Sequence, residues 1–246
     1  MTTHDATGND ETGDGATGSG AAAATPSPEA HAAAYRGIRE RVRAVVASAD
    51  RAAPCPLTPA WSVGDTLAHL VGVATDVAEG RVDGAATDPW TQAQVDARRG
   101  RTVASMLDEW ETTGPGLETI MLALPIVISG QIVFDAVTHE HDLRHALGRS
   151  GGHDSDAVAI AAGWIAGFAG AAKAETPGTI EIAYGSRTVR WGTGAPLSHA
   201  RVSEFEFVRA VSGRRSAAQL AAQGWPSASA ALAASIFSAA PTDISE

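Results

Sequence analysis

The chain has 246 residues, enough for one large domain or two modest ones, and it carries a formal net charge of −10. An acidic balance gives no attraction to nucleic-acid phosphates or to anionic membrane surfaces, and no stretch approaches the roughly 18 to 20 apolar residues of a membrane span. The N-terminus lacks a basic segment followed by an apolar run, so we expect a cytoplasmic protein with neither nucleic acid nor membrane as a partner.

The chain begins with a predicted disordered tail, residues 1–29. These residues are rich in Gly, Thr, Ala and Asp, and ordering them would bury little apolar surface in return. From residue 30 to 49, Tyr35, Ile38 and Val42 recur at helical spacing and predict the first helix. Three prolines within six positions of the following stretch prevent its continuation.

Three further helices are predicted before residue 150. The second spans residues 63–79 behind a capping-box-like Ser62, and the third begins after Pro89. Gly100 and the Gly-Pro-Gly run at 114–116 are expected to kink or interrupt this third helix. The fourth runs from about 130 to 147, with Gly148 at a left-handed cap position. Four apolar stripes with short connections predict a four-helix bundle over residues 30–152.

The pattern changes after Asp154. A helix rich in small residues follows, and residues 179–192 show two alternating runs around a Gly-Ser turn, which predicts a β-hairpin. Ser203 and Glu206 form a second capping-box pattern, and Ala-rich helices are expected from there to the end. We therefore predict a mainly α protein in which residues 153–246 form a linking helix and a small α+β domain, with the boundary near residues 150–175.

One face of the fourth predicted helix carries groups suited to binding a cation. At 100° per residue, Asp135, His139 and Asp142 fall within about 60° of one another, at the margin of the apolar stripe. Buried ionisable groups need a partner or a metal. A carboxylate and an imidazole at i and i+4 can reach one ion, and His69, on the shoulder of the second helix's stripe, is the best third ligand. His145 is a poorer candidate.

Spacing alone leaves alternatives open for these groups. The same residues could form a hydrogen-bonded core pair or a solvated helix face without a metal. Asp142 could orient a ligand or an arginine such as Arg98 or Arg99, or it could make a surface salt bridge. Cys55 is the only cysteine, which excludes a disulfide within the chain and a thiolate cluster, and we interpret it as structural.

Two segments resemble signatures of a known family. CPLTPAWSVGDTLAHLVGV is similar to the Pro-x-Trp-(Ser/Thr)-Val-x-Asp-x-x-x-His-Leu pattern of the mycothiol-dependent maleylpyruvate isomerase family. DAVTHEHDLRHALG resembles its Glu-x-x-x-His-x-x-Asp-Leu-x-x-Ala-x-Gly pattern. The resemblance implies a DinB-like four-helix bundle with His69, Asp135 and His139 as ligands of a divalent, zinc-like metal. Asp135 departs from the pattern because it is one methylene shorter than the expected Glu.

The resemblance extends to the C-terminal part, where family members carry an arginine in a Gly-Arg stretch. VSGRR supplies Arg214 and Arg215. One of them is expected to bind a substrate carboxylate in a cleft between the domains; alternatively, both decorate a helix C-terminus, where cations are favoured. We interpret Trp61 as a core anchor ahead of the second helix rather than as a substrate contact.

The function implied by the resemblance is that of a metal- and mycothiol-dependent enzyme. A metal ion favours the thiolate form of a low-molecular-weight thiol, which could then catalyse cis–trans isomerisation of a small-molecule substrate or take part in S-transfer. The sequence does not separate these outcomes, nor does it set the oligomeric state. A non-catalytic metal- or small-molecule-binding DinB-like protein is the alternative, because one fold hosts several functions.

Overall fold

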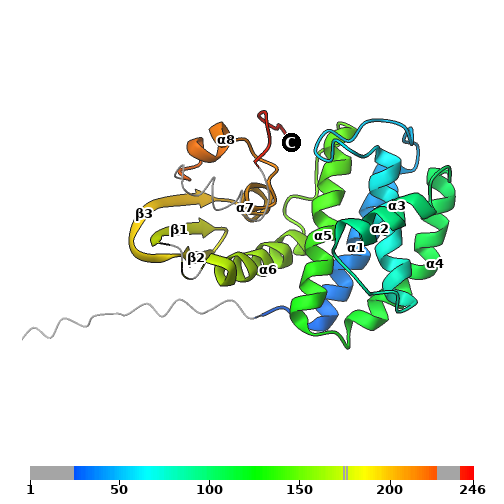
Figure 1. Cartoon of the computed structure of the whole chain (residues 1–246), viewed down its shortest axis with the longest axis horizontal. Helices are drawn as coiled ribbons and strands as arrows, with labels where there is room; N and C mark the ends of the chain where they lie inside the picture. Colours follow the sequence, from blue (N-terminus) through cyan, green and yellow to red (C-terminus); the bar gives the residue numbers. More distant parts are fainter. Residues whose placement is uncertain (1–24, 174, 176, 226–238) are drawn as a thin grey trace, which may run out of the picture.

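The computed structural model describes residues 25–173, 175, 177–225 and 239–246, which form a helical bundle and a smaller lobe with a sheet (Figure 1). The first helix of the bundle, α1, begins at Pro28 behind an N-cap at Ser27, two residues earlier than predicted. The predicted disordered tail otherwise lies mostly outside the described residues, which begin at residue 25.

Five helices build the bundle, and four of them are long: α1 (Pro28–Val46), α2 (Val63–Ala78), α3 (Asp88–Ala97), α4 (Val103–Met121) and α5 (Ile126–Ala146). The predicted third helix is interrupted near Gly100, as expected, and divides into α3 and α4. Gly100, with φ at +84°, turns the chain in a left-handed conformation that breaks the helix there.

The Gly-Pro-Gly run remains helical inside α4. Gly114 allows the buried side chain of Arg39 in α1 to lie close against this helix. A Cβ at position 114 would stand only 2.5 Å from Nε of Arg39. The fourth predicted helix, α5, begins four residues earlier than expected, at Ile126. Gly148 follows it with φ at +61°, as its predicted cap position requires.

Apolar faces of α1, α2, α4 and α5 meet in the core of the bundle. The stripe predicted for the first helix is buried, with Ile38 and Val42 fully inaccessible. Trp110 of α4 packs edge-on against Tyr35 and donates a hydrogen bond from Nε1 to the phenol oxygen, at 2.9 Å. A complete capping box at Ser62 and Asp65 fixes the start of α2 and so sets the orientation of the residues that follow.

In its described residues, the smaller lobe contains one sheet and three helices: α6 (Asp156–Lys173), β1 (Pro177–Tyr184), β2 (Arg187–Trp191), β3 (Thr193–Val202), α7 (Glu204–Val211) and α8 (Ala217–Ala222). The predicted hairpin is confirmed, since β1 and β2 pair antiparallel around Gly185. Sequence reasoning missed β3, which runs parallel to β1 and gives the sheet order β2-β1-β3. Its Gly, Pro and His residues hide the alternation typical of strands.

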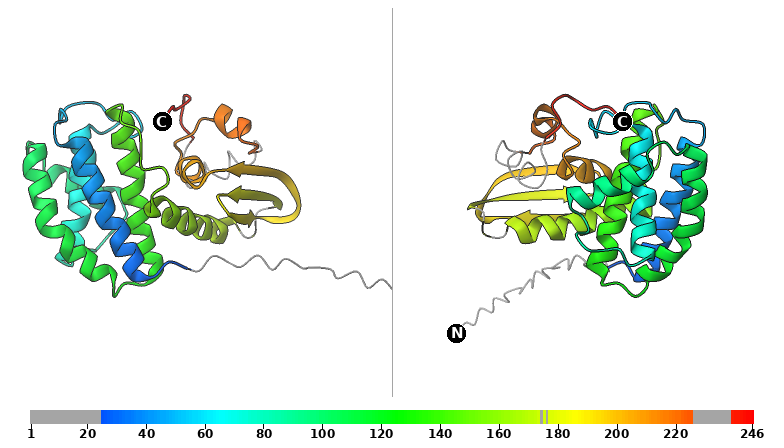
Figure 2. Two further views of the ribbon diagram at one scale, coloured as in Figure 1. Left: turned by 180° about the vertical axis from the view of Figure 1, so that it is seen from behind. Right: turned by 45° about the vertical axis from the view of Figure 1, so that its right-hand side comes forward.

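Packing joins the two lobes through α6 and through the C-terminal segment. Trp164 of α6 donates from Nε1 to the carbonyl of Val127 in α5, at 2.8 Å, and its ring centroid lies 4.9 Å from that of Phe134 in α5. Both views in Figure 2 place the C-terminal residues beside the end of α5. There Nδ1 of His145 donates to the carbonyl oxygen of Ser245, at 3.1 Å.

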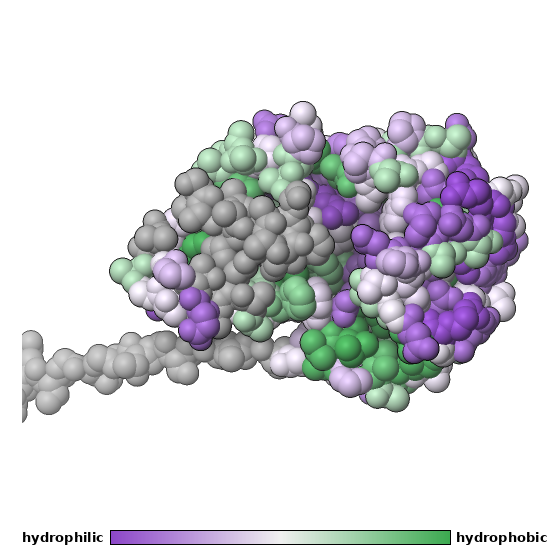
Figure 3. Space-filling view, viewed as in Figure 1, coloured by the Kyte–Doolittle hydropathy of each residue, from purple (hydrophilic) through white to green (hydrophobic). Residues whose placement is uncertain are grey.

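The capping prediction for α7 is confirmed in part, because Ser203 accepts from the backbone N–H of Glu206 without the reciprocal bond. Of the Ala-rich helices predicted after α7, α8 is confirmed, residues 226–238 lie outside the described residues, and residues 239–246 are not helical. Figure 3 shows an apolar patch over the turn from α4 to α5, where Leu122, Val127 and Ile128 are exposed. Among the described residues, none of the helices combines the length and apolar character needed to cross a membrane.

Candidate metal centre

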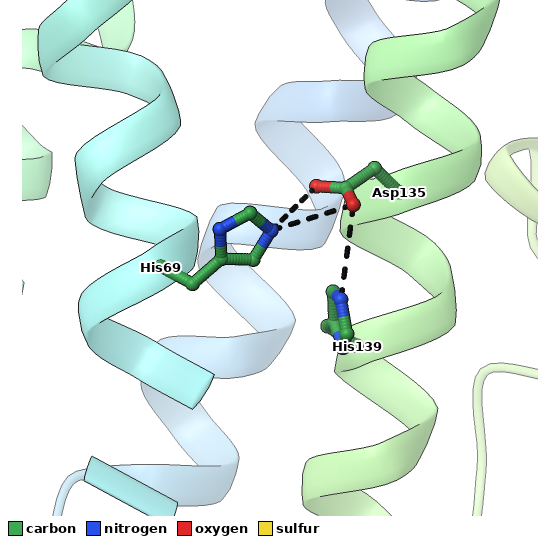
Figure 4. Close-up of side chains that lie close together, drawn as sticks. All are labelled: His69, Asp135 and His139. Carbon is green, nitrogen blue, oxygen red and sulfur yellow. Dashed lines mark hydrogen bonds and ion pairs between the residues drawn. The ribbon is translucent and has the colours of Figure 1, made fainter. Parts of the chain in front are cut away.

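The three predicted ligands meet between α2 and α5 (Figure 4). His69 comes from α2, while Asp135 and His139 stand one turn apart on α5. One ligand atom from each residue lies within 4.8 Å of the other two. The helical spacing therefore placed the residues correctly, and the imidazoles come together as the metal hypothesis requires.

The shorter carboxylate of Asp135 still reaches both imidazoles. Its Oδ2 lies 3.2 Å from Nε2 of His69, and its Oδ1 lies 3.7 Å from Nε2 of His139. Two atoms that share a tetrahedral ion with bonds of about 2.0 to 2.2 Å are roughly 3.3 to 3.6 Å apart. Measured to the same oxygen, Oδ1 of Asp135, the separations are 3.4 Å from Nε2 of His69 and 3.7 Å from Nε2 of His139, close to this range.

A hydrogen-bond chain behind His69 sets which nitrogen faces the site. Gln94 of α3 donates from Nε2 to Asp76 at 2.9 Å, which turns its amide oxygen toward Nδ1 of His69, also at 2.9 Å. The oxygen can only accept, so Nδ1 carries a proton, and Nε2 is the nitrogen that faces Asp135. Nε2 donates to the carboxylate when it is protonated, and it offers its lone pair to a metal ion when that proton is lost. Sequence reasoning missed Gln94, because it lies on a different helix from the residue that it orients.

Asp142 orients His139 in the same way. Its Oδ2 accepts from Nδ1 of His139 at 3.0 Å, so Nε2 is the nitrogen that faces Asp135. Asp142 is fully buried, and Arg209 and Arg214 reach its two oxygens from the C-terminal lobe at 3.0 and 2.8 Å. Burial alone would raise the pKa of Asp142, but the two guanidinium groups outweigh it and hold the pKa well below its usual range.

The suggested partners of Asp142, Arg98 and Arg99, are wrong. Arg98 pairs with Glu109 near the start of α4, and Arg99 pairs with the neighbouring Asp96. The actual partners lie 67 and 72 residues further along the chain. The lobes therefore share one buried ion-pair network at the back of the site.

The structure places the two predicted C-terminal arginines differently. Arg214 contacts Asp142, and its positive charge also acts on Asp135. Arg215 instead pairs with Glu206 and Glu246 within the C-terminal lobe. Among the described contacts none joins Arg215 to a ligand residue, so the site role assigned to it stays a prediction that this geometry does not favour.

Electrostatics couple Asp135 to His69. Burial opposes the charged form of each group, yet each stabilises the charge of the other. The pKa of Asp135 is consequently lowered and that of His69 raised. A cation at this point would replace the proton of His69 as the partner of the carboxylate.

Trp61 forms a wall of the site, which the sequence interpretation as a core anchor did not anticipate. Its ring centroid lies 5.3 Å from that of His69 and 5.7 Å from that of His139, and the residue is half-buried. Cys55 is buried nearby and donates weakly from Sγ to the carbonyl of Asp142, at 3.7 Å. Burial raises the pKa of this thiol, in agreement with a structural role.

The other histidines of α5 lie away from the three ligands. His141 packs against Phe205, and its buried surroundings together with the charge of Arg209 lower its pKa to about 2. His145 bonds to the C-terminal segment. Within the described part of the chain, the group of His69, Asp135 and His139 is the only set of three or more such residues with metal-binding spacing.

Comparisons with known proteins agree with the sequence interpretation of the bundle. The family model for the mycothiol maleylpyruvate isomerase N-terminal domain matches residues 32–126, a span that includes His69 and ends at the start of α5, before Asp135 and His139. Neither the curated proteins nor the solved structures gave a match. Residues 32–126 are therefore similar to the mycothiol maleylpyruvate isomerase N-terminal domain.

Proposed function

We propose that this protein is a metal- and mycothiol-dependent enzyme that uses a low-molecular-weight thiol in cis–trans isomerisation or S-transfer. The observation that supports this most is the convergence of His69, Asp135 and His139, with both imidazoles already turned to offer Nε2. The thiol and the class of reaction in this proposal come from the family whose model matches residues 32–126.

The donor set suits a divalent ion of the zinc type. Two imidazole nitrogens and one carboxylate make three protein ligands, which is the number typical of a catalytic zinc site. A structural zinc site has four protein ligands. Gln94 and Asp142 behind the histidines are the kind of outer partners that fix metal ligands. The residues therefore fit the metal that the family resemblance implies.

Each group around the centre has a proposed task. A bound divalent ion would supply positive charge that favours the thiolate over the thiol. The indole of Trp61 shields one side of the centre from water. Arg214, already turned toward Asp142 and close enough to act on Asp135, supplies a cation for a substrate carboxylate.

The chemistry divides after the sulfur attacks. In isomerisation, the sulfur of mycothiol bonds to one carbon of an activated double bond, rotation follows about the resulting single bond, and the sulfur leaves as the double bond re-forms. In S-transfer, the sulfur bonds to an electrophilic carbon and stays there, while a leaving group departs with its electron pair. The first reaction regenerates the thiol, and the second consumes it.

Metal analysis combined with one reaction assay tests the proposal. Wild type and Asp135→Ala are purified, and the control is Asp108→Ala, which removes an exposed carboxylate of α4. We expect one equivalent of metal in the wild type and the control and a large loss in Asp135→Ala. A metal-free wild type would contradict the proposal and favour the non-catalytic alternative.

The same three proteins are then incubated with mycothiol and maleylpyruvate, and product and free thiol are followed together by NMR. Isomer formed without loss of thiol identifies the isomerase reaction. Loss of thiol in proportion to product identifies S-transfer, which is then surveyed with other electrophiles. Metal bound at full occupancy without either reaction, for a range of unsaturated acids, would contradict the enzymatic part of the proposal.

A further inference from the structure

A pocket separate from the metal centre lies where the bundle meets the C-terminal lobe. Its volume is about 220 Å³, and it is lined by the end of α5, the segment that leads toward α6, and residues 245 and 246. Pockets for drug-sized ligands usually have about 300 to 1,000 Å³. The size therefore fits a small molecule or one charged group of a larger one.

The charge around this pocket favours an anion. Arg149 lines it with a guanidinium group that has no carboxylate partner among the residues described by the structure. The nearby carboxylates are already compensated, since Glu140 is bound by Arg41 and Arg144, and Glu246 is bound by two arginines of α7 and the turn after it. The guanidinium of Arg149 thus has no ion-pair partner among the side chains that the structure describes.

Hydrogen-bonding capacity in the pocket also remains unused. His141 lines the pocket, and only 3% of the residue is exposed. Its Nε2 nevertheless lacks a hydrogen-bond partner within the part of the chain that the structure describes. Buried polar atoms are normally paired, so an unpaired one beside a cavity indicates a ligand atom or a water. His153 stands next to it, stacked on Phe205 with ring centroids 4.0 Å apart, which holds that imidazole in place.

We propose that this pocket binds a small oxyanion, a phosphate or a carboxylate group, with Arg149 as its charged contact and Nε2 of His141 as a hydrogen-bond partner. Guanidinium groups bind both kinds of oxyanion through paired N–H donors. The site is distinct from the thiol and metal chemistry proposed above and does not depend on it.

Calorimetric titration with inorganic phosphate, at constant ionic strength, tests the proposal. It is performed on the wild type and on His69→Ala, which lacks a ligand of the metal centre, so that phosphate bound to a metal is recognised. We expect saturable binding to one site with equal affinity in both proteins. Binding confined to the wild type would place the anion at the metal and overturn the proposal.

A second titration uses succinate and distinguishes the two sources of the oxyanion. Saturation by phosphate alone identifies a phosphate site, and saturation by succinate alone identifies a carboxylate site. Saturation by both leaves a general oxyanion site. Absence of saturable binding for both probes would overturn the proposal.

The decisive variant is Arg149→Gln. The side chain of Arg149 is exposed, so its replacement does not threaten folding. Its matched control is Arg201→Gln on β3, an exposed arginine that loses the same charge outside the pocket. We expect Arg149→Gln to weaken binding at least roughly tenfold and Arg201→Gln to leave it unchanged, because only the first removes a charged hydrogen-bond donor from the pocket. Equal weakening in both variants would indicate a general surface-charge effect and would refute the site.

Discussion

The buried carboxylate of Asp142 provides the sharpest prediction. It is fully inaccessible and accepts hydrogen bonds from His139, Arg209 and Arg214. Asp142→Asn keeps the shape of the side chain but removes its charge and replaces one accepting oxygen by an NH₂ group. Whichever way the amide turns, its NH₂ group then faces N–H donors.

The size of the effect follows from these contacts. Removing one partner of a buried ion pair costs about 3 to 5 kcal/mol, because the remaining charge stays buried without compensation. Arg209 keeps its second partner, Glu246, whereas Arg214 loses its only described carboxylate. We therefore expect the lower end of this range, a decrease of about 3 kcal/mol in the free energy of unfolding. Loss of the bond to His139 should also weaken zinc binding roughly 10- to 100-fold.

Urea denaturation and zinc competition titration measure the two effects separately. The control is Asp96→Asn, which breaks an exposed pair with Arg99 on the surface of α3 and should change neither quantity appreciably. Equal denaturation midpoints for the two variants, together with unchanged zinc affinity in Asp142→Asn, would refute the reasoning about the shared network.

Three further predictions concern residues around the site and the core. Gln94→Leu should weaken zinc binding roughly 10- to 100-fold in the same titration, because Nδ1 of His69 loses its oriented acceptor. Glu109→Gln should lower the free energy of unfolding at neutral pH. Burial raises the pKa of Glu109, but Arg98 and its neighbours lower it overall. The stability from this depressed pKa is complete above the ordinary glutamate pKa of about 4.3 and disappears as pH falls through the folded value. Urea titrations at several pH values should therefore show the wild type and Glu109→Gln converging on acidification; a constant difference would contradict this. Gly130→Ala should cost about 1 to 3 kcal/mol in thermal or urea unfolding, because its Cβ would stand 2.7 Å from the indole of α6.

The sequence was most informative where function depends on one helix. The 100° rotation per residue places Asp135 and His139 on one face, and no knowledge of the rest of the fold is needed to predict that they lie together. His69 required one further step, its position on the shoulder of an amphipathic stripe. Those local rules were sufficient to predict the three residues that meet between α2 and α5.

Long-range contacts escaped the same reasoning. The sequence around Arg209 predicts only an amphipathic helix. Nothing in it indicates that Arg209 pairs with Asp142, 67 residues earlier in the chain. Gln94 is an ordinary helix residue by pattern, and only the packing of α3 on α2 brings it to His69. The strand β3 was missed for a related reason, because its pairing with β1 outweighs a weak local preference.

The central claim is that three side chains from two helices hold one cation. Anomalous diffraction from crystals soaked with zinc tests it directly. The account predicts one strong anomalous peak within bonding distance of Nε2 of His69, Nε2 of His139 and a carboxylate oxygen of Asp135. A crystal in which zinc binds elsewhere, with no peak between these three groups, would contradict it.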